Sequence, residues 1–145
     1  MNTDKLCLFT HNGQMHQVKV QDIPGGRLRE KGSPMDNLCN YDSREEQILL
    51  IVPDRALKDH ALLFVARSSL SKIVDGTEFL VQKKTVAATK LGEGDELAAV
   101  VLLTPENEQQ SFVVMQSEDG YFLRFPLAEI TKKKNFLITA MRQQI

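Results

Sequence analysis

The stretch LCLFTHNGQMHQVKV, residues 6–20, decides the fold, because it places an Asn-Gly pair between two runs patterned with apolar residues. Asn12-Gly13 in that setting is a strong signal for a β-hairpin, since the tight turn needs positive φ angles that Asn and Gly adopt readily. We expect one strand over 6–10, a type I′ turn at Asn12-Gly13 and a second strand over 15–20.

The same hairpin recurs twice along the chain, and internal repetition is the signature of an array of similar units. Gly120, after Asp119, takes the place of Gly13 in the last copy, and Ser69 takes it in a middle copy with a weaker turn. Three copies with a period of about 50 residues fill the chain as a single domain. We expect their boundaries near 1–55, 56–106 and 107–145, the last copy being incomplete.

A third apolar run precedes each later hairpin, at 47–52 and 97–104. Both runs are continuously apolar, so we expect both of their faces to be covered. The best helix candidate is a short turn over 53–60. Three or four short strands per unit indicate an all-β, propeller-like fold in which each unit packs against its neighbours. A β-sandwich is the alternative, but it does not account for the regular period.

Composition limits the class of protein. The chain has 145 residues, of which 42% are hydrophobic and 26% charged, so it is long enough to bury a core and is typical of a globular domain. No apolar run approaches the roughly 18 residues that cross a bilayer, and no signal core follows the polar N-terminus. With only two cysteines, it is expected to be a soluble, cytoplasmic protein without a membrane partner.

The net charge of −1 hides a separation of charge by position in the repeat. The segments that follow the three hairpins hold ten basic residues and one acid, Glu30, and carry +9, so the rest carries −10. Because repeated units stack in register, the basic loops are expected to lie along one edge. Nine of the ten are our candidate DNA-binding residues, with Arg142 outside the set: Arg27, Arg29, Lys31, Lys83, Lys84, Lys90, Lys132, Lys133 and Lys134.

A periodic basic edge suits the backbone of a polyanion such as double-stranded DNA. Nothing resembles a base-reading helix, and no aromatic series lies among the lysines to stack on bases. Contacts should therefore be directed at phosphates, be insensitive to sequence and weaken with salt. The alternatives are that these are ordinary solvated loops, or that the acidic segments 42–46 and 93–96 dock a protein partner.

No catalytic constellation is visible. Tyr41 and Tyr121 lack an adjacent basic residue and are interpreted as surface or edge aromatics. A zinc site would need Cys7, His11, His16 and Cys39, yet Cys7 and His11 lie about 13 Å apart along a strand. An acidic β-turn accounts for Glu93, Asp95 and Glu96 better than a calcium loop does. We expect no catalytic residue, metal or cofactor in this chain.

The repeats resemble those in the C-terminal domain of the bacterial DNA gyrase A protein and of its topoisomerase IV equivalent. The similarity spans the chain, and three segments carry it: 8–32, 91–97 and 118–130, which read LFTHNGQMHQVKVQDIPGGRLREKG, LGEGDEL and EDGYFLRFPLAEI. The resemblance implies a β-pinwheel, a ring of about six four-stranded blades with strands exchanged between neighbours, around whose basic rim DNA bends. This chain then represents about three blades.

The family resemblance also implies which proteins this chain works with and which functional residues lie elsewhere in the parent protein. The parent protein would be the A subunit of an ATP-dependent bacterial type II topoisomerase. It would act in the nucleoid with its ATPase B subunit, and the DNA-cleaving residues would lie in the rest of the A subunit, outside this chain. The gyrase box Gln-Arg-Arg-Gly-Gly-Lys-Gly is absent, and 27–32 takes its place, which favours the topoisomerase IV type while leaving gyrase open. Open blade edges also suggest a homodimer.

Overall fold

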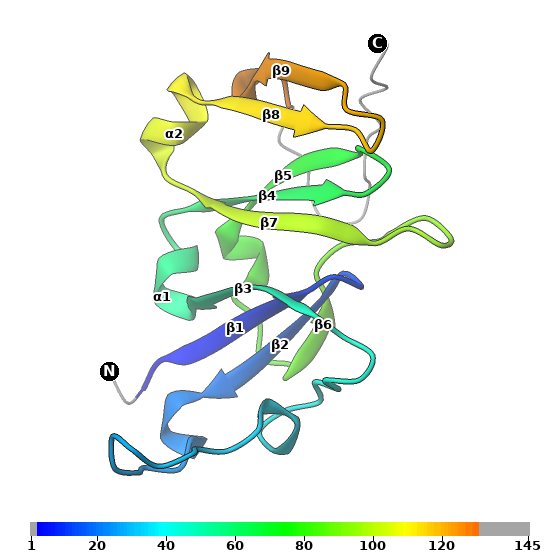
Figure 1. The fold of residues 1–145 in the computed structure, drawn as a ribbon. Helices are drawn as coiled ribbons and strands as arrows, with labels where there is room; N and C mark the ends of the chain where they lie inside the picture. Colours follow the sequence, from blue (N-terminus) through cyan, green and yellow to red (C-terminus); the bar gives the residue numbers. More distant parts are fainter. Residues whose placement is uncertain (1–2, 131–145) are drawn as a thin grey trace.

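A computed structural model of the chain describes residues 3–130, whose strands form antiparallel sheets stacked as successive blades (Figure 1). Blade 1 is a four-stranded sheet in the order β3-β1-β2-β6, from β1 (Lys5–Thr10), β2 (Gln14–Lys19), β3 (Ile48–Pro53) and β6 (Thr85–Ala87). Blade 2 has the order β5-β4-β7, from β4 (Ala61–Ala66), β5 (Ser71–Asp75) and β7 (Leu97–Leu103). Blade 3 is the pair β8 (Phe112–Gln116) and β9 (Phe122–Pro126).

One strand is exchanged between blades. β6 follows the β4-β5 hairpin of blade 2 in sequence, yet it pairs with β2 and completes blade 1. The expected all-β architecture of propeller-like blades is therefore present. Sheets of four, three and two strands are seen within residues 3–130, and the division of the chain at 55 and 106 stays a prediction.

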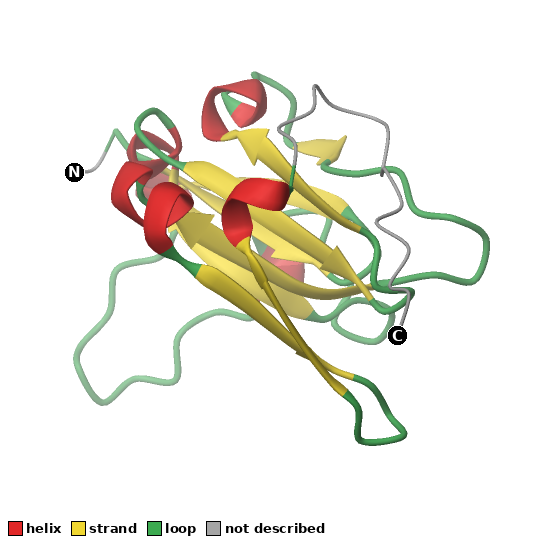
Figure 2. Cartoon of the chain, turned by 90° about the horizontal axis from the view of Figure 1, so that it is seen from above, coloured by secondary structure: helices red, strands yellow, loops and turns green. Residues whose placement is uncertain are grey.

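The short helices that directly follow strands gather on one side of the molecule, at the same ends of the strands (Figure 2), whereas η2 (Met35–Asn37) lies in the long loop before β3. The short helices are α1 (Asp54–Leu57), α2 (Pro105–Gln110) and the 3-10 turns η1 (Val20–Asp22), η2, η3 (Gly76–Phe79) and η4 (Leu127–Glu129). The expected turn over 53–60 is confirmed as α1. Helix α2 was not expected, although Thr104 as the cap and Pro105 in the first turn are ordinary signals for a helix start.

The hairpin turns share one conformation that differs from the expected type I′. The Gly13 N–H donates to the Thr10 carbonyl at 3.1 Å, and φ is +81° at Gly13. Ser69 and Gly120 hold the same place with φ of +68° and +87°. Asn12 does not have a positive φ, so the expectation of two such residues is wrong. Each loop is a type I turn followed by a left-handed residue, the usual three-residue hairpin connection.

The core lies between the blades. Between blades 1 and 2, the rings of Phe9, Phe64 and Phe79 meet with centroids 5.3–6.0 Å apart. Edge-to-face packing of this kind adds to the gain from burying each ring. Leu63 and Ile73 of blade 2 pack with Leu127, Ile130 and partly buried side chains of blade 3 in a second cluster. The apolar faces of the hairpins thus hold the stack together.

Two strands are more open than expected. The runs that form β3 and β7 were expected to be covered on both faces, but Ile51 is 50% and Val101 is 44% exposed. Both strands lie at the edge of their blade, and they contact each other across the stack, so part of each stays open to solvent.

Candidate nucleic-acid interface

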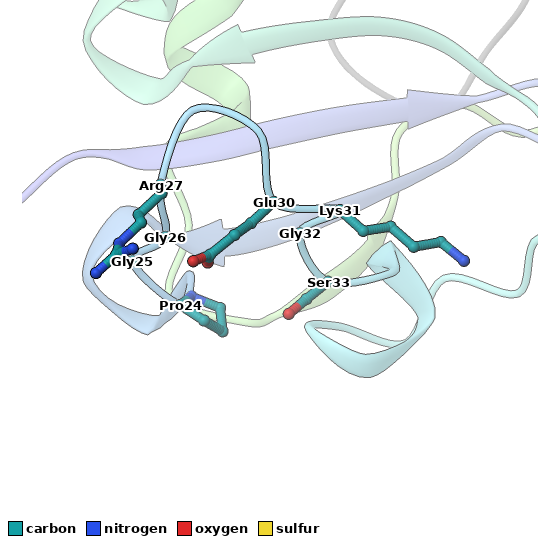
Figure 3. A pocket seen from close by; sticks show the side chains of 8 residues that line it. All are labelled: Pro24, Gly25, Gly26, Arg27, Glu30, Lys31, Gly32 and Ser33. Carbon is teal, nitrogen blue, oxygen red and sulfur yellow. The ribbon is translucent and has the colours of Figure 1, made fainter.

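The loop that follows η1 projects the first basic group into solvent. Arg27, Arg29 and Lys31 are all exposed. Residues 24–27 and 30–33 line a hollow of about 480 Å³ on the concave side of this loop (Figure 3). Glu30 folds back over Gly26, while the side chain of Lys31 points away from the hollow (Figure 3). The one acid of the basic segment therefore lies apart from the Lys31 ammonium.

The second basic group lies on backbone that blade 1 holds in place. The Gln17 side chain, in a residue only 7% exposed, donates to the carbonyl oxygens of Val81 and Lys83 at 3.0 and 2.7 Å. The Gln17 backbone N–H donates to the Lys84 carbonyl at 2.7 Å. These bonds fix the path of the chain into β6, so Lys83 and Lys84 present exposed ammonium groups from an ordered segment.

Lys90 lies at the opposite end of β6. The N–H groups of Ala88 and Thr89 both donate to the Gly13 carbonyl, at 2.8 and 3.2 Å, and Lys90 follows them with an exposed side chain. Lys83 and Lys84 before β6, and Lys90 after it, thus flank the strand at one edge of blade 1. Lys132, Lys133 and Lys134 lie outside the described residues, as does Arg142.

Two lysines outside the predicted set join this region. Lys5 and Lys19 are directly opposite each other across β1 and β2. With Lys84 and Asp22 they line a depression of about 170 Å³. The hairpin register could have identified the pair, since like charges directly opposite on two strands are unfavourable unless something else balances them. Asp22 lines the same depression without forming an ion pair with either lysine in residues 3–130.

The basic side chains of the candidate interface are not paired with acidic side chains. Within residues 3–130, none of the six described candidate cations forms an ion pair, and neither does Lys5 or Lys19. Some cations elsewhere are paired: Arg67 lies 2.9 Å from Glu96, and Arg55 lies 3.5 Å from Asp4. Lys58 and Arg124 also form no ion pair in residues 3–130, so what distinguishes the cations near β6 and after η1 is that several unpaired ones lie within two short segments.

A buried polar cluster anchors the long loop that carries Arg27, Arg29 and Lys31 as it returns to blade 1. His16 Nε2 lies 2.9 Å from Glu46 Oε1, and the two side chains are only 3% and 7% exposed. Burial acts to raise the pKa of the Glu46 carboxyl, but hydrogen bonds from His16 and the Asp42 N–H outweigh it and hold that pKa below its ordinary value. The Tyr41 hydroxyl donates to the Glu46 carbonyl at 3.0 Å, so Tyr41 serves the loop as a structural residue.

The two acidic segments are engaged mostly within the chain. Glu46 is buried against His16, and Asp42 Oδ1 accepts from the Arg44 N–H at 3.0 Å. Asp95 accepts from the hydroxyl of Ser68 at 2.5 Å, and its N–H closes a turn on the Gly92 carbonyl at 3.1 Å. Glu45 and Glu93 remain exposed on these segments, so docking of a basic partner there stays a prediction.

The residues considered for zinc are not gathered together. Cys7 and His16 lie on opposite faces of blade 1, because Cys7 pairs with Gln17 in the register while His16 pairs with the neighbouring Leu8. Burial raises the pKa of the Cys7 thiol to about 12. His11 Nδ1 accepts from the backbone N–H of Gln47 at 3.0 Å. Across residues 3–130 no three His, Cys, Asp or Glu side chains are placed to hold a metal, and no helix there could cross a membrane.

Comparison with known proteins decides the family. The family model described as "DNA gyrase C-terminal domain, beta-propeller" matches residues 4–34, 61–104 and 111–135, more than half of the chain. The chain belongs to this DNA gyrase C-terminal domain family. The matched segments include the three hairpins and all six described candidate cations.

Relatives in this family include the A proteins of both kinds of type II topoisomerase. The A subunit of DNA gyrase from Lawsonia intracellularis is 29% identical over 131 residues, which are 89% of this chain and 15% of the relative. The A subunit of DNA topoisomerase 4 from Bacillus subtilis is 30% identical over 131 residues, 88% of this chain and 16% of the relative. The chain thus spans about a sixth of the length of these relatives.

Solved structures show the same fold. The chain matches a crystal structure of the C-terminal domain of DNA topoisomerase IV with a TM-score of 0.82 at 23% identity, covering 93% of this chain and 41% of that one. It matches a DNA gyrase A C-terminal domain with a TM-score of 0.61 at 19% identity, covering 94% and 42%. The expected gyrase A and topoisomerase IV kinship and the propeller-like fold are confirmed.

Proposed function

We propose that this chain is a DNA-binding module from the A subunit of a bacterial type II topoisomerase, which binds and bends duplex DNA through its basic loops. It contributes no catalytic group itself; DNA cleavage belongs to the rest of the A subunit, and ATP hydrolysis belongs to the B subunit. Membership of the gyrase C-terminal domain family supports the assignment to a topoisomerase A subunit. The uncompensated cations around β6 and after η1 support the role in binding.

The observation that carries this proposal is the contrast between two groups of cations. Six exposed candidates have no acidic partner in the described part of the chain, whereas arginines such as Arg44 and Arg67 lie 3.4 and 2.9 Å from carboxylates. Each unpaired cation can neutralise one phosphate and release a condensed counterion from the DNA. Because that contact reads no base, binding should be independent of sequence.

The test is the salt dependence of binding to a duplex for two triple variants. Arg27→Ala with Arg29→Ala and Lys31→Ala removes one group, and Lys83→Ala with Lys84→Ala and Lys90→Ala removes the other. Each triple variant should reduce the slope of log K against log salt by about 2–3, at about 0.9 for each phosphate contact. At low salt, the affinity of each triple variant should fall by about the same factor for duplexes of unrelated sequence.

A charge-matched control separates phosphate contacts from net charge. The triple variant of Arg44, Lys58 and Arg67 to alanine also removes three positive charges, all exposed, two of them near carboxylates. It should change the slope by less than about 1. If the control lowers the slope as much as the loop variants do, or if the loop variants leave it unchanged, the proposal is wrong for these residues.

A further inference from the structure

The loop after η1 carries an apolar side chain that the fold does not use. Leu28 is 102% exposed, so its side chain packs against nothing in residues 3–130. The other large apolar residues exposed in that range are at most 70% exposed, and all but Leu80 and Tyr121 lie in strands. A single exposed leucine is ordinary on a protein surface, so its role depends on what surrounds it.

A β-turn holds Leu28 at the tip of this loop. The Glu30 N–H donates to the Arg27 carbonyl at 3.0 Å, which places Leu28 and Arg29 at the two central positions of the turn. The loop extends beyond the sheet of blade 1 (Figure 1). Residues 24–27 and 30–33 line its concave side, and the two central residues of the turn do not. The side chains of Leu28 and Arg29 therefore lie on the outside of the loop.

Cations flank the leucine on both sides, and the one nearby acid turns away from it. Arg27 and Arg29 are exposed and form no ion pair within residues 3–130. The Glu30 carboxylate folds back over Gly26 on the concave side (Figure 3). The tip thus presents an apolar side chain between two unpaired guanidinium groups.

The second basic group has no apolar side chain of this kind. Leu91 follows Lys90 directly, and Val81 and Val86 flank the segment with Lys84. All three of these apolar residues are partly buried against the core between blades 1 and 2. They stabilise the fold, whereas Leu28 has no packing partner in the described part of the chain, so truncating Leu28 should leave the fold intact.

We propose that Leu28 is a wedge that inserts between two base pairs of duplex DNA from the minor groove, while Arg27 and Arg29 bind phosphates that border the groove. This inference rests on the proposed function and adds a local kink where the loop meets the DNA. Proteins that bind the minor groove insert leucine and similar side chains between base steps, which unstacks the bases and kinks the duplex. The insertion reads no base edge, so it agrees with contacts directed at phosphates.

The test is the fluorescence of 2-aminopurine, an adenine analogue whose emission rises when it is unstacked. It replaces the adenine of a central TpA step, the one pyrimidine–purine step in a duplex of about 20 base pairs, because such steps kink most easily. The full 145-residue chain is added to saturation, as judged by the anisotropy of an end label. Wild type should raise the emission by at least about 2-fold, and Leu28→Ala by less than about 1.2-fold. The salt slope of Leu28→Ala should equal that of wild type, because no charge is lost.

Two further variants separate insertion from a general loss of apolar surface. Leu28→Met keeps an apolar side chain of similar length, so it should keep the rise in emission. Leu80→Ala makes the same truncation at another leucine, which is 38% exposed, and it should behave like wild type.

A Leu28→Ala variant that raises the emission as much as wild type would overturn the wedge. A wild-type chain that binds the duplex with the expected salt slope but leaves the emission unchanged would also overturn it, while the proposed function stands. A chain that fails to bind duplex DNA at low salt would overturn both.

Discussion

Glu46 offers the sharpest test of how the basic loop after η1 is held to blade 1. Its carboxylate accepts from His16 Nε2 at 2.9 and 3.1 Å, from the Asp42 N–H at 3.0 Å and from the Thr10 hydroxyl at 3.2 Å. Glu46→Ala removes all of these acceptors at once. The His16 ring, itself 2% exposed, then loses the partner of Nε2 in a buried place.

The loss of stability expected for Glu46→Ala follows from the burial of the His16 ring. Leaving a buried donor without its partner costs about 1–3 kcal/mol, and Glu46→Ala leaves the His16 ring, the Asp42 N–H and the Thr10 hydroxyl without this acceptor together. We expect the free energy of unfolding to fall by about 3 kcal/mol or more at pH 7. With a urea m-value of about 1–3 kcal/mol per molar, this lowers the unfolding midpoint by about 1–3 M.

The same contact sets a pH dependence. Folding lowers the pKa of Glu46, so its stabilisation is fully present above the ordinary pKa of the unfolded chain and is lost as pH falls through the lower folded value. Wild type should therefore lose stability in acid more steeply than Glu46→Ala does. Urea unfolding followed by circular dichroism at several pH values measures both effects.

Glu45→Ala is the matched control, because Glu45 is the exposed neighbour. It should change stability by less than about 0.5 kcal/mol. Should Glu46→Ala unfold at the same urea concentration as Glu45→Ala, the buried pair does not anchor the loop, and the reasoning fails.

Three further predictions concern other parts of the chain. Gly76→Ala should lower stability by about 2–3 kcal/mol in urea unfolding, since its Cβ would lie 2.2 Å from a backbone oxygen, whereas Gly25→Ala, with nothing within 4 Å, should be nearly neutral. Ser69→Gly should raise the unfolding temperature, because φ is +68° there, and glycine avoids a cost of about 1 kcal/mol. Lys5→Ala combined with Lys19→Ala should reduce the salt slope of DNA binding by about 2, and an unchanged slope would remove that pair from the interface.

Much of the fold could be predicted from the sequence because the hairpin signal is local and repeated. Gly13, Ser69 and Gly120 align by pattern alone, and all three have positive φ in the structure. The type of turn was missed because an Asn-Gly pair fits both a two-residue and a three-residue loop. Helix α2 was missed although Thr104 and Pro105 signal its start.

The site was harder to predict because its geometry depends on long-range pairing. Lys5 and Lys19 become neighbours of Lys84 only when β6 crosses from blade 2 to pair with β2. A strand of three residues has little periodicity to reveal that exchange. Likewise, the acidic segment 42–46 looked available to a partner, but Glu46 turns inward to His16, which no local pattern indicates.

The most direct test of the central claim is the salt dependence of binding of the unaltered chain to two duplexes of unrelated sequence. With six to nine phosphate contacts at about 0.9 each, the slope of log K against log salt should lie between about −5 and −8 for both duplexes. A slope shallower than about −2, or a strong preference for one sequence, would contradict the account of basic loops that bind the DNA backbone.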